Sequence, residues 1–180
     1  GNFGNILAAY YAKEMGLPIG RLICASNSNN VLTDFLTTGV YDRNRTFYNT
    51  ISPSMDILIS SNLERLLFAV TQSDSEVRGY MEELAASGRY QVSDKVKTAI
   101  GRHFAAGCCD DANTKRVISE VYKTYGYLMD PHTAVAFDVL ERYRRDTGDE
   151  APALVVSTAS PFKFCDNILD ALGQKEIASG

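Results

Sequence analysis

Residues 1–27 read GNFGNILAAYYAKEMGLPIGRLICASN and carry the local signals that decide the fold. A glycine-rich turn at residues 1–5 leads into an apolar helical pattern that ends at Gly16. Residues 21–25 then form a short apolar run with the composition of a buried strand. A helix followed by a buried strand is typical of α/β proteins, in which helices cover a parallel sheet.

The remainder of the sequence repeats this alternation of helical and strand-like segments. The expected helices lie at residues 27–39, 62–70, 75–87, 94–105, 110–125 and 131–146. Further strands are expected at the apolar end of residues 51–60, at residues 125–130 and at residues 154–157. The pattern predicts one α/β lobe over residues 1–180, with a parallel sheet wrapped by helices. Because no strand precedes Gly1, we expect the chain to be the carboxyl-terminal part of a longer protein.

Composition and net charge exclude several classes of binding partner. The 180 residues are 45% hydrophobic, and the formal net charge is -4 with a pI near 5.2. Since no long basic stripe is present, nucleic acid and anionic membrane surfaces are not expected partners. The sequence contains no run of 18 apolar residues, so no membrane span is predicted. The four cysteines have neither disulfide-framework nor zinc-site spacing, so we expect unbonded thiols in a reducing cytoplasm.

The turn Gly1-Asn2-Phe3-Gly4-Asn5 has the composition of an anion site. Glycines permit positive φ and close backbone approach, and the first N–H groups of the following helix carry the positive end of its dipole. Asn2 and Asn5 add amide donors, and Phe3 is placed to cover a ligand. An ordinary connecting turn remains the alternative, since neither the Walker loop nor the G-x-G-x-x-G pattern is present.

A second group of polar residues follows the expected strand at residues 154–157. Ligands of open α/β sheets bind beyond the carboxyl ends of the strands, where Thr158 and Ser160 are expected. Their hydroxyl groups are suited to face a ligand. An ordinary cap for a helix that begins at Pro161 is an equally good interpretation.

Five segments, in the same order along the chain, resemble threonine synthase of the bacterial and fungal type. They are residues 1–27, TTGVYD, SPSMDILISSNLERLLF, DPHTAVAF and VVSTASPFKF. The resemblance implies a partial tryptophan synthase β-like domain of fold type II, which uses pyridoxal 5'-phosphate. It also implies conversion of O-phosphohomoserine and water to L-threonine and phosphate, so O-phosphohomoserine is the expected small-molecule substrate.

The resemblance assigns roles to individual residues. Gly1, Asn2, Phe3, Gly4 and Asn5 match the loop that holds the cofactor's phosphate in that family. Thr158 matches the hydroxyl residue that faces the pyridine nitrogen, and Ser160 stands where many members have histidine. The Schiff-base lysine of the family lies upstream of the phosphate loop. No lysine here aligns with it, and Lys163 matches a peripheral lysine. We therefore expect the missing amino-terminal part to supply the catalytic lysine and the chain alone to be inactive.

Two other functions stay open on sequence alone. One is another lyase of the same fold, such as a threonine or serine dehydratase, and the other is a non-catalytic module that binds a phosphorylated metabolite. His132 is expected to be exposed or to cap a helix. Asp56 is expected to stabilise a turn, with a role in shaping the site as the alternative.

Overall fold

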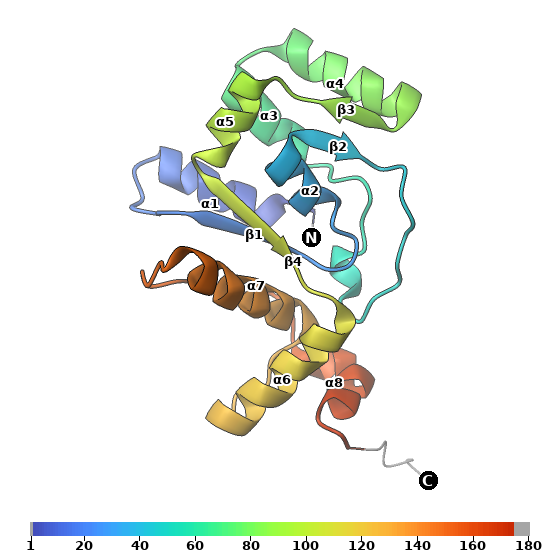
Figure 1. Cartoon of the computed structure of the whole chain (residues 1–180), viewed down its shortest axis with the longest axis vertical. Helices are drawn as coiled ribbons and strands as arrows, with labels where there is room; N and C mark the ends of the chain where they lie inside the picture. Colours follow the sequence, from blue (N-terminus) through green and yellow to red (C-terminus); the bar gives the residue numbers. More distant parts are fainter. Residues whose placement is uncertain (1, 175–180) are drawn as a thin grey trace.

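The computed structural model describes residues 2–174 of the chain (Figure 1). The α-helices are α1 (Gly4–Glu14), α2 (Val31–Thr38), α3 (Leu63–Thr71), α4 (Asp74–Ser87), α5 (Asp94–Gly101), α6 (Asp111–Tyr125), α7 (Pro131–Thr147) and α8 (Cys165–Ala171). Two short 3-10 helices are η1 (Pro53–Met55) and η2 (Pro161–Phe164). The strands are β1 (Leu22–Ser26), β2 (Val40–Asp42), β3 (Arg89–Gln91) and β4 (Phe104–Cys108).

Two strands form a parallel sheet at the centre of the molecule. β1 pairs with β4, with Leu22 opposite Phe104 and Ser26 opposite Cys108. Successive side chains of a strand point to opposite faces, so β1 serves two layers. Its buried residues Leu22 and Cys24 join a large core with α1 and α2, while Ile23 packs on the opposite side against a cluster that includes α7. The result is a helix–sheet–helix arrangement around a parallel sheet.

The large core continues beyond the sheet into α3, α4 and α5. A second pair of strands, β2 and β3, is antiparallel and contributes Tyr41 and Tyr90, whose stacked rings lie 5.3 Å apart. Phe35 of α2 packs on both rings with centroid distances of 5.9 Å. These large apolar side chains are almost fully buried, and they join the first helices of the chain to the segment around β3.

A smaller core holds the last three helices together below the sheet (Figure 1). Ile118 of α6, Ala134 of α7 and Ile168 of α8 are buried in it. α7 approaches the sheet so closely that a Cβ atom on Gly107 of β4 would lie 2.8 Å from Val139 Cγ1. Glycine is therefore required at this position of the strand.

The six expected helices downstream of β1 are present. Ser73, Ser93, Asp110 and Asp130 each accept a first-turn N–H as N-cap residues of α4, α5, α6 and α7. Left-handed glycines end α2, α4 and α6, as the sequence predicts, and Gly148 ends α7 in the same way. The helix predicted at residues 94–105 ends earlier, at Gly101, because the chain turns there into β4.

Three strand predictions are wrong for this structure. Residues 51–60 form a loop with η1, and residues 125–130 form the loop between α6 and α7. Residues 154–157 have no regular secondary structure and pair with no strand among residues 2–174. β2, β3 and β4 were missed, because two of them have three residues and the third contains Ala-Ala-Gly. The predicted fold class, a parallel sheet wrapped by helices, is confirmed.

None of the helices in the described residues has both the length and the apolar character needed to cross a membrane. The assignment of the whole chain to one domain stays a prediction.

Candidate functional site

The N-terminal turn, residues 2–5, precedes α1 and has an unusual backbone. Phe3 has φ 62° and ψ 8°, which is the left-handed region, although it is not a glycine. This conformation costs an L-residue roughly 1–2 kcal/mol. The Phe3 side chain is 3% exposed, and its ring lies 5.6 Å from that of Phe104. Phe3 therefore anchors the turn in the core, and the expectation that it covers a ligand is not supported.

Asn2 is engaged by the segment before α3. Its Oδ1 accepts a hydrogen bond from the N–H of Ser61 at 2.7 Å, and its Nδ2 donates to Ser61 Oγ at 2.7 Å. The amide of Asn62 donates to the backbone carbonyl of Asn2 at 2.9 Å. The side chain of Asn2 thus fixes the turn, and one of the two hydrogens of its Nδ2 is used in doing so.

Gly4 has no conformational reason to be glycine. Its backbone is helical, and it is absent from the glycines with positive φ. A Cβ atom placed on it would meet only Asn62 Nδ2, at an ordinary contact distance of 3.6 Å. Neither backbone strain nor packing within the described residues excludes a side chain. The remaining physical reason for glycine is the close approach of a ligand to the backbone.

The turn offers hydrogen-bond donors to such a ligand. The first intrahelical bond of α1 runs from Leu7 N to Phe3 O at 3.1 Å, so the N–H groups of Gly4, Asn5 and Ile6 precede the helical ladder. The first turn of α1 contains no acidic residue, and the Asn5 side chain is exposed. This donor set fits the phosphate of a cofactor. Gly1, the other predicted member, lies outside the described residues.

Thr158 lies in a different setting. It follows α7 at the end of the 152–158 segment, which has no regular secondary structure, and it is exposed. In this segment Leu154 is 90% exposed. The segment makes one hydrogen bond to the rest of residues 2–174, between Ser157 Oγ and Thr133 Oγ1 at 2.9 Å. The described residues contain no hydrogen bond between Thr158 and the N-terminal turn.

A buried polar network that was not predicted from the sequence lies where β1 ends. Asn27 Nδ2 lies 2.7 Å from Asp56 Oδ1, and Asn29 Nδ2 donates to the same oxygen at 2.9 Å. Thr50 donates its N–H to Asp56 Oδ2 at 3.0 Å and its hydroxyl to Oδ1 at 2.7 Å. Asp56 therefore holds the loop that follows β2, as the turn interpretation predicted. The run of asparagines directly after a strand was the available signal.

His132 bridges three elements. Its Nδ1 lies 2.8 Å from Asp130 Oδ1, its Nε2 accepts the N–H of Ser54 at 3.1 Å, and its ring lies 5.0 Å from that of Phe164. With Nε2 as the acceptor, Nδ1 is the nitrogen that donates to Asp130. Of the two expectations, an exposed or a capping histidine, the first is wrong, since the side chain is 11% exposed. His132 joins α7 to η1 and η2 and accepts an N–H at the start of η1.

Asp130 caps α7 with a buried carboxylate. Burial by itself raises the pKa of Asp130, but hydrogen bonds from His132 and Thr133 outweigh burial, and the pKa lies below its usual value. Asp130 is therefore ionised at neutral pH and stabilises the start of α7.

The cysteines and Lys163 lie apart from this chemistry. All four cysteines are free, as predicted. Burial raises the pKa of Cys24 to about 11 and that of Cys109 to about 12, so both thiols are protonated at neutral pH. Lys163 is exposed on η2.

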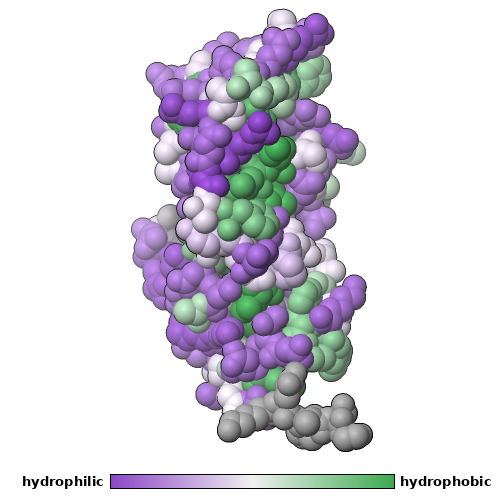
Figure 2. All heavy atoms as spheres, turned by 90° about the vertical axis from the view of Figure 1, so that its right-hand side faces the viewer, coloured by the Kyte–Doolittle hydropathy of each residue, from purple (hydrophilic) through white to green (hydrophobic). Residues whose placement is uncertain are grey.

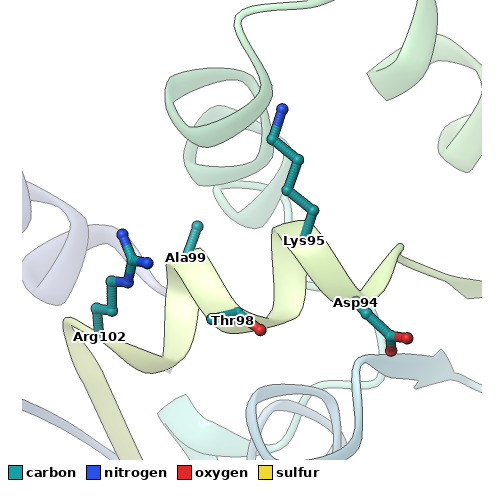
Figure 3. A pocket seen from close by; sticks show the side chains of 5 residues that line it. All are labelled: Asp94, Lys95, Thr98, Ala99 and Arg102. Atoms are coloured by element: carbon teal, nitrogen blue, oxygen red, sulfur yellow. The ribbon is translucent and has the colours of Figure 1, made fainter.

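A hollow of about 390 Å³ on α5 contains none of the predicted residues (Figure 3). It is lined by Asp94, Lys95, Thr98 and Ala99 of α5 and by Arg102, the residue that follows this helix. Figure 3 shows Lys95 and Arg102 pointing to one side of α5 and Asp94 to the other. Because no polar groups converge from separate elements, this hollow lacks the features of a ligand site.

The face beyond the carboxyl ends of β1 and β4 is a better candidate for ligand binding than the hollow on α5. Figure 2 looks onto the side toward which these strands point, and apolar side chains reach the surface in the middle of a largely polar face. The loop between β2 and α3 contains the exposed side chains Phe47, Tyr48 and Ile59. Apolar groups gathered at a ligand-facing edge are typical of a surface that another chain or a ligand covers.

Comparison with known proteins gives one consistent result. Residues 133–179 match the family model described as "Threonine synthase, C-terminal". The chain is 45% identical to "Threonine synthase-like 1" of Homo sapiens over 98% of its length and 37% identical to "Threonine synthase" of Saccharomyces cerevisiae over 96%. The crystal structure of PLP-bound threonine synthase from Brucella melitensis is similar to it with a TM-score of 0.89, 43% identity and 99% coverage of the chain.

The chain spans a minor part of each of these relatives. It covers 24% of the human protein, 36% of the yeast protein and 38% of the Brucella melitensis chain. The similarity therefore describes one segment of those proteins, and it extends along almost the whole of the present sequence.

Proposed function

Since the chain belongs to the threonine synthase family and corresponds to its carboxyl-terminal part, we propose that the protein containing it converts O-phosphohomoserine and water to L-threonine and phosphate. The cofactor is pyridoxal 5'-phosphate, which when bound supplies an electron sink for bond making and breaking on the amino acid. The chain acts as one α/β lobe in a cytoplasmic enzyme and contributes part of the cofactor site.

The N-terminal turn supports this proposal most directly. Backbone N–H groups of Gly4 and Asn5, together with Gly1, bind the phosphate of the cofactor, while Asn2 and Phe3 hold the turn in its left-handed conformation. The lack of any packing reason for Gly4 agrees with close approach of a phosphate. Thr158 places its hydroxyl toward the pyridine nitrogen. A hydroxyl, unlike a carboxylate, does not hold that nitrogen protonated, so the ring is a moderate electron sink.

The lysine that carries the cofactor is assigned to the amino-terminal part of the same enzyme. Lys163 is exposed on η2, which supports a peripheral role. The partner of this chain is therefore that amino-terminal part, and the two together complete the site.

The full-length protein tests the activity. With saturating pyridoxal 5'-phosphate it should release phosphate from O-phosphohomoserine in step with L-threonine. The second candidate is a lyase of the same fold acting on another amino acid. Formation of an oxo acid and ammonia from threonine or serine, without phosphate release from O-phosphohomoserine, would establish that candidate instead. Phosphate binding with no turnover of any of these amino acids would indicate a non-catalytic module.

Gly4 tests the cofactor assignment separately from activity. In the full-length protein, Gly4→Leu should weaken pyridoxal-phosphate binding at least tenfold, because its side chain occupies the space of the phosphate. Gly20→Leu is the matched control, since Gly20 is also exposed and a Cβ there has no neighbour within 4 Å. Equal cofactor affinity in the two variants would remove the N-terminal turn from the site.

The 180-residue chain alone tests whether the catalytic lysine lies in the amino-terminal part of the enzyme. Purified alone and supplied with pyridoxal 5'-phosphate, it should produce no threonine, because no lysine of the chain is assigned to the cofactor. Turnover by the chain alone would contradict this assignment.

A further inference from the structure

The N-terminal turn is held by a segment 59 residues further along the chain. The N–H of Ser61 donates to Asn2 Oδ1 at 2.7 Å, and Asn2 Nδ2 donates back to Ser61 Oγ at 2.7 Å. Asn62 Nδ2 donates to the Asn2 carbonyl at 2.9 Å. These three bonds fix both the side chain and the carbonyl of the residue directly before Phe3.

α3 begins without the cap that its sequence offers. Asparagine at the N-cap position normally accepts a first-turn N–H, but Asn62 makes no such bond and turns its amide to the N-terminal turn. The hydroxyl of Ser60 is buried and has no partner within residues 2–174. A capping residue that does not cap its own helix is a local departure of the kind found at functional positions.

The starts of α1 and α3 therefore lie together. A Cβ atom on Gly4 would be 3.6 Å from Asn62 Nδ2. Both helices carry the positive end of their dipoles at this place; the first turn of α1 contains no carboxylate, whereas that of α3 contains Glu64. This contact joins the start of α3 to the residues whose N–H groups precede the helical ladder of α1.

We infer that Ser61 and Asn62 are positioning residues for the phosphate of the cofactor. They act through Asn2: they fix its side chain and carbonyl, which holds Phe3 left-handed and directs the N–H groups of Gly4 and Asn5 toward the phosphate. Asn2 is likewise a positioning residue and not a direct ligand. This inference rests on the proposed function.

Two substitutions in the full-length protein test the inference. Ser61→Ala removes the acceptor of Asn2 Nδ2, and Asn62→Ser leaves a hydroxyl able to cap α3 but too short to reach Asn2. Each should raise the dissociation constant for pyridoxal 5'-phosphate about tenfold, the effect of one lost hydrogen bond, measured by titration of cofactor fluorescence. The ³¹P resonance of the bound phosphate should shift. The thermal midpoint of the cofactor-free protein should remain that of the wild type.

Matched variants separate positioning from general structural damage. Asn44→Ser removes a bond of the same kind, from Asn44 Nδ2 to Ser87 O at 2.8 Å, and should leave cofactor affinity and the ³¹P resonance unchanged. Ser61→Thr keeps the hydroxyl and should restore affinity. Because the Ser61 hydroxyl acts through Asn2, Asn2→Ala combined with Ser61→Ala should weaken binding little more than Asn2→Ala alone.

Wild-type affinity and a wild-type ³¹P resonance in both Ser61→Ala and Asn62→Ser would overturn the inference, as would a lowered thermal midpoint with unchanged affinity. If the wild-type protein binds no pyridoxal phosphate, the proposed function fails and this inference fails with it.

Discussion

The two predicted halves of the cofactor site differ sharply in how the chain supports them. The N-terminal turn has a buried aromatic anchor at Phe3 and three hydrogen bonds to the start of α3. The 152–158 segment has one side-chain hydrogen bond, at Ser157, and its Leu154 is 90% exposed. The first half is organised by contacts within this chain, and the second is not.

This difference explains why the sequence of the 152–158 segment predicts a strand although the structure has none there. Pro-Ala-Leu-Val-Val has the composition of a buried strand, but a strand exists only where a neighbour accepts and donates its backbone hydrogen bonds. β1 and β4 form a sheet of two strands in the described residues, and no strand lies beside the segment. The amino-terminal part of the proposed enzyme is the expected source of the missing neighbour.

Phe3→Ala should give the largest effect, because it removes the anchor that distinguishes the turn from the segment. We expect the free energy of unfolding to fall by about 3–5 kcal/mol, the usual cost of deleting a buried phenyl ring. Urea denaturation of the chain measures it. Tyr11→Ala, at a half-exposed position on α1, is the control and should cost far less. Equal losses in the two variants would show that the turn has no anchor.

Thr133→Val should loosen the segment further. The change keeps the shape of a buried side chain but deletes the hydroxyl that contacts both Asp130 and Ser157. We expect a loss of about 1–2 kcal/mol, as for a buried hydrogen bond, together with faster proteolysis within residues 152–158. Unchanged proteolysis would mean that Ser157 does not hold the segment.

The pH dependence of stability should report on Asp130 with a smaller effect. Its folded pKa lies below the usual value of 3.8, so its contribution is complete above that value and is lost as pH falls through the lowered folded pKa. Unfolding midpoints in urea, measured from neutral pH down to about pH 2, should therefore fall less in Asp130→Asn than in the wild type. Parallel curves would contradict this account.

Leu154→Ser should give the smallest effect in the isolated chain. Because the side chain is almost fully exposed, the free energy of unfolding should change by no more than about 0.5 kcal/mol. In the full-length protein the same change should cost clearly more, since pairing with the amino-terminal part would bury Leu154. Equal losses of stability in the isolated chain and the full-length protein would show that the amino-terminal part does not cover the 152–158 segment.

Sequence reasoning succeeded where the signal is local. Ser73, Ser93 and Asp130 cap their helices, and Gly39 and Gly126 end theirs, so the helices were predictable within a few residues. It failed where a distant partner decides the outcome. β4 contains Gly107 because Val139 of α7 approaches it, and no pattern near that glycine records the approach.

In the candidate site, too, local features were predicted and long-range contacts were not. The composition of the N-terminal turn predicted an anion cradle, but the left-handed backbone of Phe3 and the contact of Asn2 with Ser61 depend on residues far along the chain. Glycine was the obvious choice for positive φ, yet it is Phe3 that has it, and Gly4 is helical.

Gly4 has a consequence for anyone who engineers this protein. Library selections and consensus methods that reward thermal robustness judge a residue by what it does for the polypeptide alone. By that measure Gly4 is a defect, because alanine fits the helix, meets no clash and is the better helix former. Such a selection would therefore favour Gly4→Ala, and if Gly4 contacts the phosphate as proposed, the variant would bind the cofactor more weakly without any sign of it in the melting curve of the cofactor-free protein. Selection for cofactor retention has to accompany selection for stability.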